Sequence, residues 1–189
     1  MFVSVKSDAV FGPEGKIIAI RHTWTFDEMY SSFAVEGMTG AGKGPSEAEL
    51  QGIAKQNVED LAQYGWFTQA RVGSQKLTFA APVDYSMTRQ ADTGDLELRF
   101  TLPLAAPASA GRAFTFEVYD PSYFVAFEFD AKTQPVLVGA PKGCSISLFK
   151  PKPLDPTMQA KLNESFFSGL SPGADFGVQL AERVIVACP

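Results

Sequence analysis

The stretch GMTGAGKGPS, residues 37–46, has the spacing of a phosphate-binding loop. Its first seven positions match the pattern G-x-x-x-x-G-K-[ST], but Gly44 stands where a Ser or Thr hydroxyl should bind Mg²⁺. The helix signal begins only at Ser46, so the amides of a helix N-terminus would not face a phosphate held at Lys43. We therefore expect no nucleotide site, and we interpret the stretch as a glycine-rich segment leading into an amphipathic helix.

His22, the single histidine of the chain, is the most conspicuous candidate for a metal ligand or a pH-dependent switch. It lies between Ile20 and Trp24 in an alternating apolar run, where a histidine is more often a hydrogen-bonded core residue. Asp27 and Glu28 are further candidate metal ligands, and they would equally stabilise the first turn of a helix. The chain has no CxxC or HxxxH motif that would complete a metal site.

Cys144 and Cys188 are the two cysteines, and each lies at the end of a predicted strand. Their thiols are in phase with the apolar residues of those strands, so we expect both to face inward. A disulfide, a buried reduced pair and a catalytic thiol are all compatible with this placement. A disulfide that closes a loop of this length would stabilise the fold by about 4 kcal/mol in the chain-entropy model.

Length and composition limit the classes of protein to which the chain can belong. With 189 residues, 46 % hydrophobic and 20 % charged, it has a globular composition, and we expect a single domain over residues 1–189. The net charge of −5 and the scattered basic residues argue against nucleic acid as a partner. No apolar run approaches the roughly 18 residues of a membrane span, so we do not expect the chain to cross a membrane.

The elements that would position these residues are mostly strands. A capping box formed by Ser46 and Glu49 introduces the long helix predicted at 47–64, and shorter helices are predicted at 26–35 and near 156–167. We therefore predict an α+β domain, mainly antiparallel β-sheet with one long amphipathic helix and one or two shorter helices. The predicted strands cover residues 2–10, 16–26, 66–72, 76–81, 84–90, 96–104, 114–119, 123–129, 135–138, 144–149 and 183–188.

Asp120 and Tyr123 are the candidate residues of a ligand or partner site. Asp120 begins a tight turn, Asp-Pro-Ser, between two aromatic strands, where its carboxylate would accept hydrogen bonds from the amides of the turn. The aromatic side chains around it would also border a pocket. The aromatic residues from Tyr123 to Phe129 are expected mainly in the core.

Several segments together resemble a known family over essentially the whole chain. The family comprises exported bacterial proteins of unknown function that are described as the periplasmic component of an uncharacterised ABC-type transport system. The segments are RHTWTFDEMYS (21–31), NVEDLAQYGWF (57–67), FEVYDPSYFVAFE (116–128), GC (143–144) and VACP (186–189).

The resemblance implies a periplasmic location, with a leader peptide absent from this chain, and in that compartment a disulfide between Cys144 and Cys188. It also implies a link to metal homeostasis, because such proteins are often paired with nickel- or cobalt-type membrane permeases. The expected partner is therefore an inner-membrane metal permease, and the candidate cofactor is a divalent transition metal such as zinc, nickel or cobalt.

Family members commonly carry His-Pro-His ahead of the strand that starts here at Phe2, and this chain lacks it. A hairpin register that places Phe2 opposite Thr25 would bring residues before Met1 next to Asp27 and Glu28. Imidazoles beside two carboxylates could assemble a metal site with nitrogen and oxygen ligands, which we treat as a hypothesis.

Relatives can also show an EF-hand-like loop before the long helix. With Glu49 at the twelfth position of such a loop, Met38, Gly40 and Gly42 occupy positions one, three and five. Their side chains carry no oxygen ligands, so we expect no calcium at residues 38–49.

These observations together favour a non-catalytic periplasmic accessory or binding component of a transport system, with transition-metal handling as its candidate role. The alternative is an exported structural or interaction domain that docks a membrane partner without a ligand of its own. An enzyme is not expected, because the sequence shows no nucleophile–base pair, paired-carboxylate motif or cofactor fingerprint.

Overall fold

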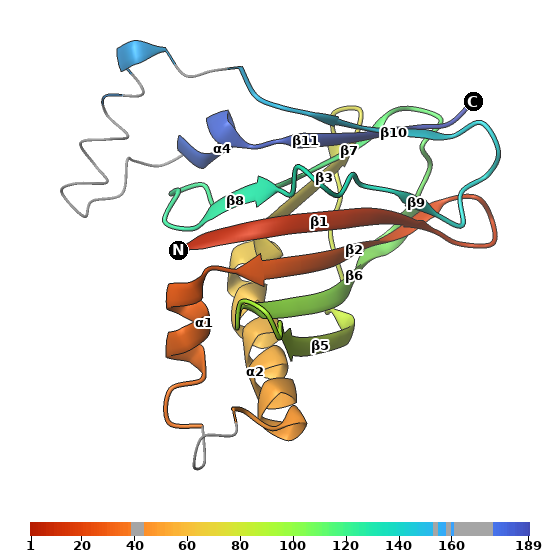
Figure 1. Cartoon of the computed structure of the whole chain (residues 1–189). Helices are drawn as coiled ribbons and strands as arrows, with labels where there is room; N and C mark the ends of the chain where they lie inside the picture. Colours follow the sequence, from red (N-terminus) through yellow and green to blue (C-terminus); the bar gives the residue numbers. More distant parts are fainter. Residues whose placement is uncertain (39–43, 153–154, 158–159, 161–175) are drawn as a thin grey trace.

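The computed structural model of the chain describes residues 1–38, 44–152, 155–157, 160 and 176–189. Two β-sheets lie against each other, with α1 and α2 on the side of the first sheet and α4 next to the start of β11 (Figure 1). Most strand pairs are antiparallel, and β1 pairs in parallel with β8 and β9. The predicted α+β class, with mainly antiparallel sheet and few helices, is confirmed.

The first sheet has the strand order β5-β6-β2-β1-β8, with β9 paired to β1, and the second has the order β10-β11-β7-β3-β4. The first sheet is built from β1 (Phe2–Phe11), β2 (Ile17–Phe26), β5 (Val83–Arg89), β6 (Leu96–Ala108), β8 (Ala126–Phe129) and β9 (Leu137–Val138). The second is built from β3 (Thr68–Val72), β4 (Gln75–Lys76), β7 (Phe114–Val118), β10 (Ser145–Phe149) and β11 (Arg183–Ala187).

The predicted hairpin of β1 and β2 is present, but its expected register is wrong by two residues. Ser4, and not Phe2, pairs with Thr25, and the carbonyl of Phe2 accepts a hydrogen bond from the amide of Asp27 at 3.1 Å. The register shifts between Val10 and Phe11 near the turn, a local irregularity that alternation of residue types does not reveal. Because the offset is even, the buried face of the strand is unchanged.

The helices are α1 (Glu28–Ala34), α2 (Glu47–Asp60), the 3₁₀ helix η1 (Leu61–Phe67) and the short α4 (Phe176–Leu180). The predicted capping box is present, with the amide of Ser46 donating to Glu49 at 2.7 Å and the amide of Glu49 donating to the Ser46 hydroxyl at 3.3 Å. The long helix ends earlier than the predicted residue 64, because η1 follows it. The helix predicted near 156–167 lies largely outside the described residues, and α4 was not predicted.

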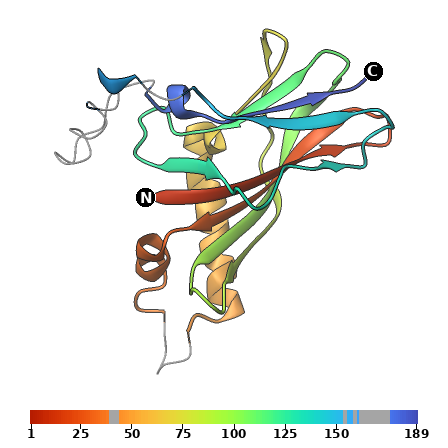
Figure 2. The same cartoon turned by 45° about the horizontal axis from the view of Figure 1, so that its top comes forward.

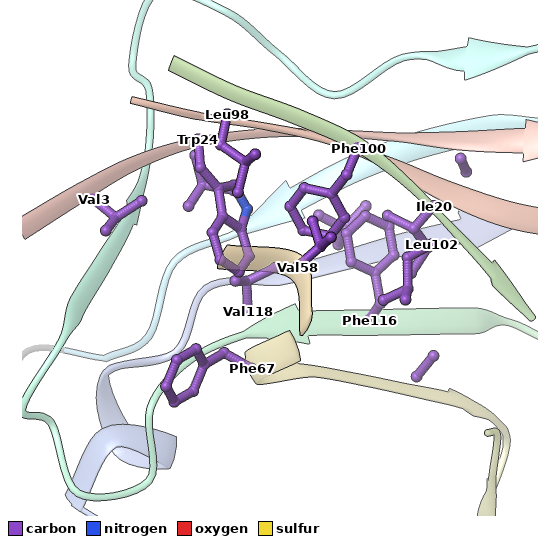
Figure 3. Packing of buried hydrophobic residues seen from close by; sticks show 14 of the residues in the cluster. Val3, Ile20, Trp24, Val58, Phe67, Leu98, Phe100, Leu102, Phe116 and Val118 are labelled. Carbon is purple, nitrogen blue, oxygen red and sulfur yellow. The ribbon is translucent and has the colours of Figure 1, made fainter. Parts of the chain in front are cut away.

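The core is formed between the two sheets and is completed by α2 and η1. Figure 3 shows aromatic and aliphatic side chains from both sheets facing one another, with Val58 of α2 and Phe67 of η1 beside them. Figures 1 and 2 show α1 and α2 near each other on the same side of the first sheet, beyond the end of β2. A cavity lined by described residues lies between these two helices and the sheet.

Candidate binding groove

An apolar groove of about 630 Å³ lies between α1, α2, η1 and the end of the first sheet. We call it the α1–α2 groove. Its volume is in the range of small-molecule and peptide sites. It is lined by Met1, Val3, Trp24, Phe26, Tyr30, Phe33, Ala34, Met38, Glu49, Gly52, Ile53, Gln56, Asn57, Asp60, Leu61, Tyr64, Phe67, Val125 and Phe127.

The floor of the groove is a series of aromatic rings from different elements. The ring centroids of Trp24 and Phe127 lie 5.0 Å apart, and those of Phe127 and Phe67 lie 5.2 Å apart. The ring of Tyr64 stacks on Phe67 at 5.2 Å. On the side of α1, Phe26 and Tyr30 are in contact at 4.5 Å. Such ring contacts hold a surface rigid, so the floor is preorganised.

Phe67 reaches the floor because the chain makes an unusual turn after α2. Gly65, Trp66 and Phe67 have φ angles of 58°, 51° and 49°, in the left-handed region. Glycine adopts this conformation freely, whereas Trp66 and Phe67 do so at an energetic cost. The indole of Trp66 compensates by donating from Nε1 to the carbonyl of Val58 at 3.0 Å. Backbone strain of this kind is concentrated at binding sites in many proteins.

The indole nitrogen of Trp24 is buried and has no hydrogen-bond partner within the described part of the chain. Figure 3 shows this nitrogen on the edge of the indole that faces Phe100. The two rings are nearly perpendicular, at 87°, with centroids 5.0 Å apart, which suits a weak N–H···π contact. Trp24 therefore contributes apolar ring surface to the groove.

The polar side chains of the groove already have partners. Tyr30 donates from its hydroxyl to Asn57 at 2.9 Å, and this bond joins α1 to α2. Asn57 in turn donates to the carbonyl of Ile53 at 2.9 Å. Gln56 donates to Asp60 at 2.9 Å. Burial raises the pKa of Tyr30 and outweighs the opposite effect of the bond to Asn57.

Large apolar side chains remain exposed around the groove. The exposed fractions are 74 % for Phe33, 72 % for Met29, 57 % for Tyr64 and 76 % for Phe124. Phe33 and Tyr64 line the groove itself, and Phe124 adjoins the lining residue Val125. An exposed apolar surface of this kind marks a site that a ligand or partner covers.

His22 is placed in the core and not in the groove. Its Nδ1 lies 2.8 Å from the hydroxyl of Ser7, and its Nε2 lies 3.4 Å from the hydroxyl oxygen of Thr68. Because Thr68 donates its own proton to the carbonyl of Trp66 at 2.8 Å, it accepts from Nε2–H, and Ser7 donates to Nδ1. Burial lowers the pKa of His22 to about 3, so the ring is neutral.

Asp27 and Glu28 lie at the start of α1, as predicted. Asp27 is the N-cap: it accepts from the amide of Tyr30 at 2.8 Å and from the amide of Phe2 at 2.6 Å. Burial alone would raise the pKa of Asp27, but these two hydrogen bonds outweigh it and lower the pKa. Within the described ranges, no group of three or more His, Cys, Asp or Glu side chains could hold a metal ion.

The structure therefore does not gather His22, Asp27 and Glu28 into one metal site. His22 lies opposite Ser7, in the interior, whereas Asp27 lies opposite Phe2 at the end of the hairpin. The part of the hypothesis that involves residues before Met1 remains a prediction. Of the loop 38–49, predicted to lack calcium, residues 39–43 lie outside the described residues, so the absence of calcium there remains a prediction.

Asp120 and Tyr123 are brought together, but a helix covers them. Asp120 accepts from the amide of Ser122 at 2.9 Å and from the amide of Val125 at 3.0 Å, which is its predicted role in the turn. The ring of Tyr123 lies 6.0 Å from that of Phe176 in α4. The cavity around them measures only about 10 Å³, which is about enough for one water molecule, so a larger ligand would not fit there.

The disulfide between Cys144 and Cys188 is present, with their Cα atoms 4.1 Å apart. The two residues extend the antiparallel pairing of β10 and β11, in which Ser145 lies opposite Ala187. The bond closes the ends of these two strands, which are 44 residues apart in the sequence. Three alternatives were open for the cysteines: a disulfide, a buried reduced pair and a catalytic thiol. The structure contains the disulfide.

The groove is the feature that sequence reasoning missed. The residue pattern predicts Phe127 in the core and Phe67 in a strand, and neither prediction indicates a groove. A signal was present in α1, EMYSSFA, in which Met29, Tyr30 and Phe33 are neighbours at helical spacing and form a wide apolar surface on a helix of only seven residues. A wide apolar surface on so short a helix indicates a second contact surface.

Comparison with known proteins places the chain among proteins without an assigned activity. An uncharacterised protein of Haemophilus influenzae is 25 % identical over 167 residues, covering 87 % of this chain and 79 % of the relative. An uncharacterised 15.5 kDa protein in the trpE 3′ region of Spirochaeta aurantia is 28 % identical over 123 residues, covering 65 % of this chain and 80 % of the relative. No solved structure matches the chain significantly. Within the described residues, no helix has the length and apolar character needed to cross a membrane.

The family profile "Protein of unknown function (DUF1007)" matches residues 1–188, which is nearly the entire chain. The resemblance inferred from the sequence is thereby confirmed at the level of a family without a known function, while export and the transport system remain proposals. The protein belongs to the DUF1007 family.

Proposed function

We propose that this protein is a non-catalytic periplasmic binding component of a transport system, and that the α1–α2 groove is its binding site. The observation that carries the proposal is the groove itself, an apolar hollow of about 630 Å³ with exposed aromatic side chains around it. An apolar surface of this size is costly to leave in water, which favours an occupant.

The periplasmic location is supported by the disulfide between Cys144 and Cys188, since such bonds persist in oxidising compartments. The transport system is supported by the resemblance described above. Metal handling, which the same resemblance implies, would depend on the segment before Met1 and on Asp27, and it is separate from the groove.

Gly52 offers a direct test of the groove. It lies within α2 and lines the groove, and a Cβ added to it would meet no atom within 4 Å. Gly52→Ala should therefore leave the groove open and stabilise α2 by about 0.5–1 kcal/mol. Gly52→Phe should fill the groove with a ring.

The measurement is titration with N-phenyl-1-naphthylamine, a neutral apolar dye that fluoresces when it leaves water. We expect the wild type and Gly52→Ala to bind the dye with similar affinity, and Gly52→Phe to bind it at least about tenfold more weakly, which corresponds to about 1.4 kcal/mol. Absence of dye binding by the wild type, or equal binding by Gly52→Phe, would show that the groove is not a binding site.

A further inference from the structure

The net charge of the protein is concentrated beside the groove. Residues 27–61, which include α1 and α2, carry seven of the 21 acidic residues and only two of the 16 basic residues of the chain. This segment therefore has a net charge of −5, equal to that of the whole chain, and the rest of the sequence is neutral. A segment with this net charge attracts cationic groups over a distance of about 8–10 Å at physiological salt.

The acidic side chains that line the groove form no ion pair with a basic residue in the described part of the chain. Glu49 and Asp60 line the groove, near opposite ends of α2. Among the described acidic residues of α1 and α2, the only ion pair is that of Glu59 with Lys55, at 3.9 Å. Glu49 is ionised, because hydrogen bonds from the amide and the hydroxyl of Ser46 lower its pKa. An occupant that carries positive charge would be attracted to this rim.

The main chain at Val3, which lines the groove, is paired with a neighbouring strand on both sides. Val3 lies between two strands, opposite Phe26 on one side and Phe127 on the other. The polar side chains of the groove are partnered as well, through the bonds between Tyr30 and Asn57. A peptide lying on this surface must satisfy its own amides and carbonyls, and an α-helix does so.

The dimensions of the groove suit a short helix. The lining residues of α2 run from Glu49 to Asp60, a length of about 17 Å at 1.5 Å per residue. A helix of about three turns has the same length. Its apolar residues at positions i, i+3, i+4 and i+7 would contact the aromatic floor, while Lys or Arg side chains at its edges would reach the acidic rim.

We propose that the occupant of the α1–α2 groove is a basic amphipathic helix of a partner protein. This inference rests on the proposed function, because it names the partner of the same groove. Apolar contacts with Phe33, Tyr64 and Phe127 supply affinity. The charges of Glu49 and Asp60 select a basic partner and orient it.

The test uses synthetic 14-residue amphipathic peptides that compete with N-phenyl-1-naphthylamine. One peptide combines leucine and lysine, a second has the same pattern with glutamate in place of lysine, and a third has the composition of the first in scrambled order. We expect the leucine–lysine peptide to displace the dye, with an affinity that falls as salt increases. The glutamate and scrambled peptides should bind at least about tenfold more weakly.

Variants of α2 test the role of charge. Glu49→Gln combined with Asp60→Asn preserves the hydrogen-bonding pattern of both positions, since glutamine also completes a capping box. This double variant should lose about fivefold or more in affinity for the leucine–lysine peptide. Glu59→Gln, on the same helix but outside the groove, is the matched control and should change the affinity less than twofold.

The outcomes separate the two proposals. If the protein binds the dye but binds the lysine and glutamate peptides with equal affinity, the proposal of a basic helix is overturned. The groove would then still be a binding site. Failure of the wild type to bind the dye would overturn both. Binding to anionic lipid vesicles in preference to the leucine–lysine peptide would also overturn the inference, because a membrane would then be the occupant.

Discussion

His22 shows how a residue that looks functional in the sequence can be structural. Its neighbours Ile20 and Trp24 indicated a core position, and both ring nitrogens have partners in the interior. What the sequence could not provide was the identity of those partners, because Ser7 and Thr68 come from different strands and meet His22 only in the folded state. Asp27 was easier to predict, since an N-cap depends on adjacent residues.

The buried imidazole makes the stability of the protein depend on pH. In the folded state the pKa of His22 is about 3, whereas in the unfolded chain it is near its ordinary value of 6.5. Below pH 6.5 the unfolded state therefore binds a proton that the folded state does not, and stability falls as the pH falls toward 3. At pH 5 this residue should lower the free energy of unfolding by about 2 kcal/mol relative to pH 7.5.

His22→Gln removes the titrating ring and keeps an amide that can hydrogen-bond. At pH 7.5 the variant should be less stable by about 1–3 kcal/mol, through imperfect pairing with Ser7 and Thr68. On acidification to pH 5 it should lose about 2 kcal/mol less than the wild type does. Urea unfolding at the two pH values measures both quantities, and identical losses for the two proteins would refute the buried neutral histidine.

At the scale of elements, the strands and helix ends that depend on local residue patterns were predicted well. The points at which the chain changes direction were not. The hairpin of β1 and β2 and the capping box of α2 follow from alternation and from residues three apart. The left-handed turn at Gly65 to Phe67 was missed, because Trp and Phe rarely adopt it and the sequence resembles the start of a strand. This turn is what brings Phe67 to the groove.

Helix α4 provides a prediction at this scale. Its Gly177 donates to the carbonyl of Pro121 at 3.0 Å, and a Cβ at this position would overlap the carbonyl oxygen of Asp120. Gly177→Ala should therefore displace α4 from the turn and destabilise the protein by about 1–3 kcal/mol. Hydrogen exchange should show faster exchange of the Gly177 amide than in the wild type.

Gly52→Ala serves as the comparison for this prediction, because the Cβ added at Gly52 meets open space. Retention of the wild-type exchange rate in Gly177→Ala would mean that α4 does not pack on the Asp120 turn in solution. In that case Tyr123 and Asp120 would be open to a ligand after all.

At the scale of the molecule, the fold class followed from the sequence but the binding surface did not. The strands follow from the alternation of residue types within single segments. The disulfide was expected from the compartment that the family resemblance implies. The α1–α2 groove combines residues from α1, α2, η1 and the first sheet, whose relative positions only the structure provides. The charge of −5 was evident in the sequence, but its relation to a surface became clear only once α1 and α2 were placed beside the groove.

The disulfide sets the stability of the second sheet. It closes a loop of 44 residues and holds the edge strand β10 to β11. Replacing both Cys144 and Cys188 by Ser should lower the free energy of unfolding by about 4 kcal/mol. Urea unfolding of this variant and of the oxidised wild type measures the difference. A wild type whose stability does not change on reduction would contradict the role given to the bond.

The measurement that tests the central claim most directly is an NMR titration of the isotope-labelled protein with the leucine–lysine peptide. The amide signals of Tyr30, Ile53 and Phe127, which lie on three sides of the groove, should shift together and saturate at one equivalent of peptide. Signals of β10 and β11 should stay unchanged. Shifts confined to residues outside the groove, or no shifts at saturating peptide, would contradict the assignment of the α1–α2 groove as the binding site.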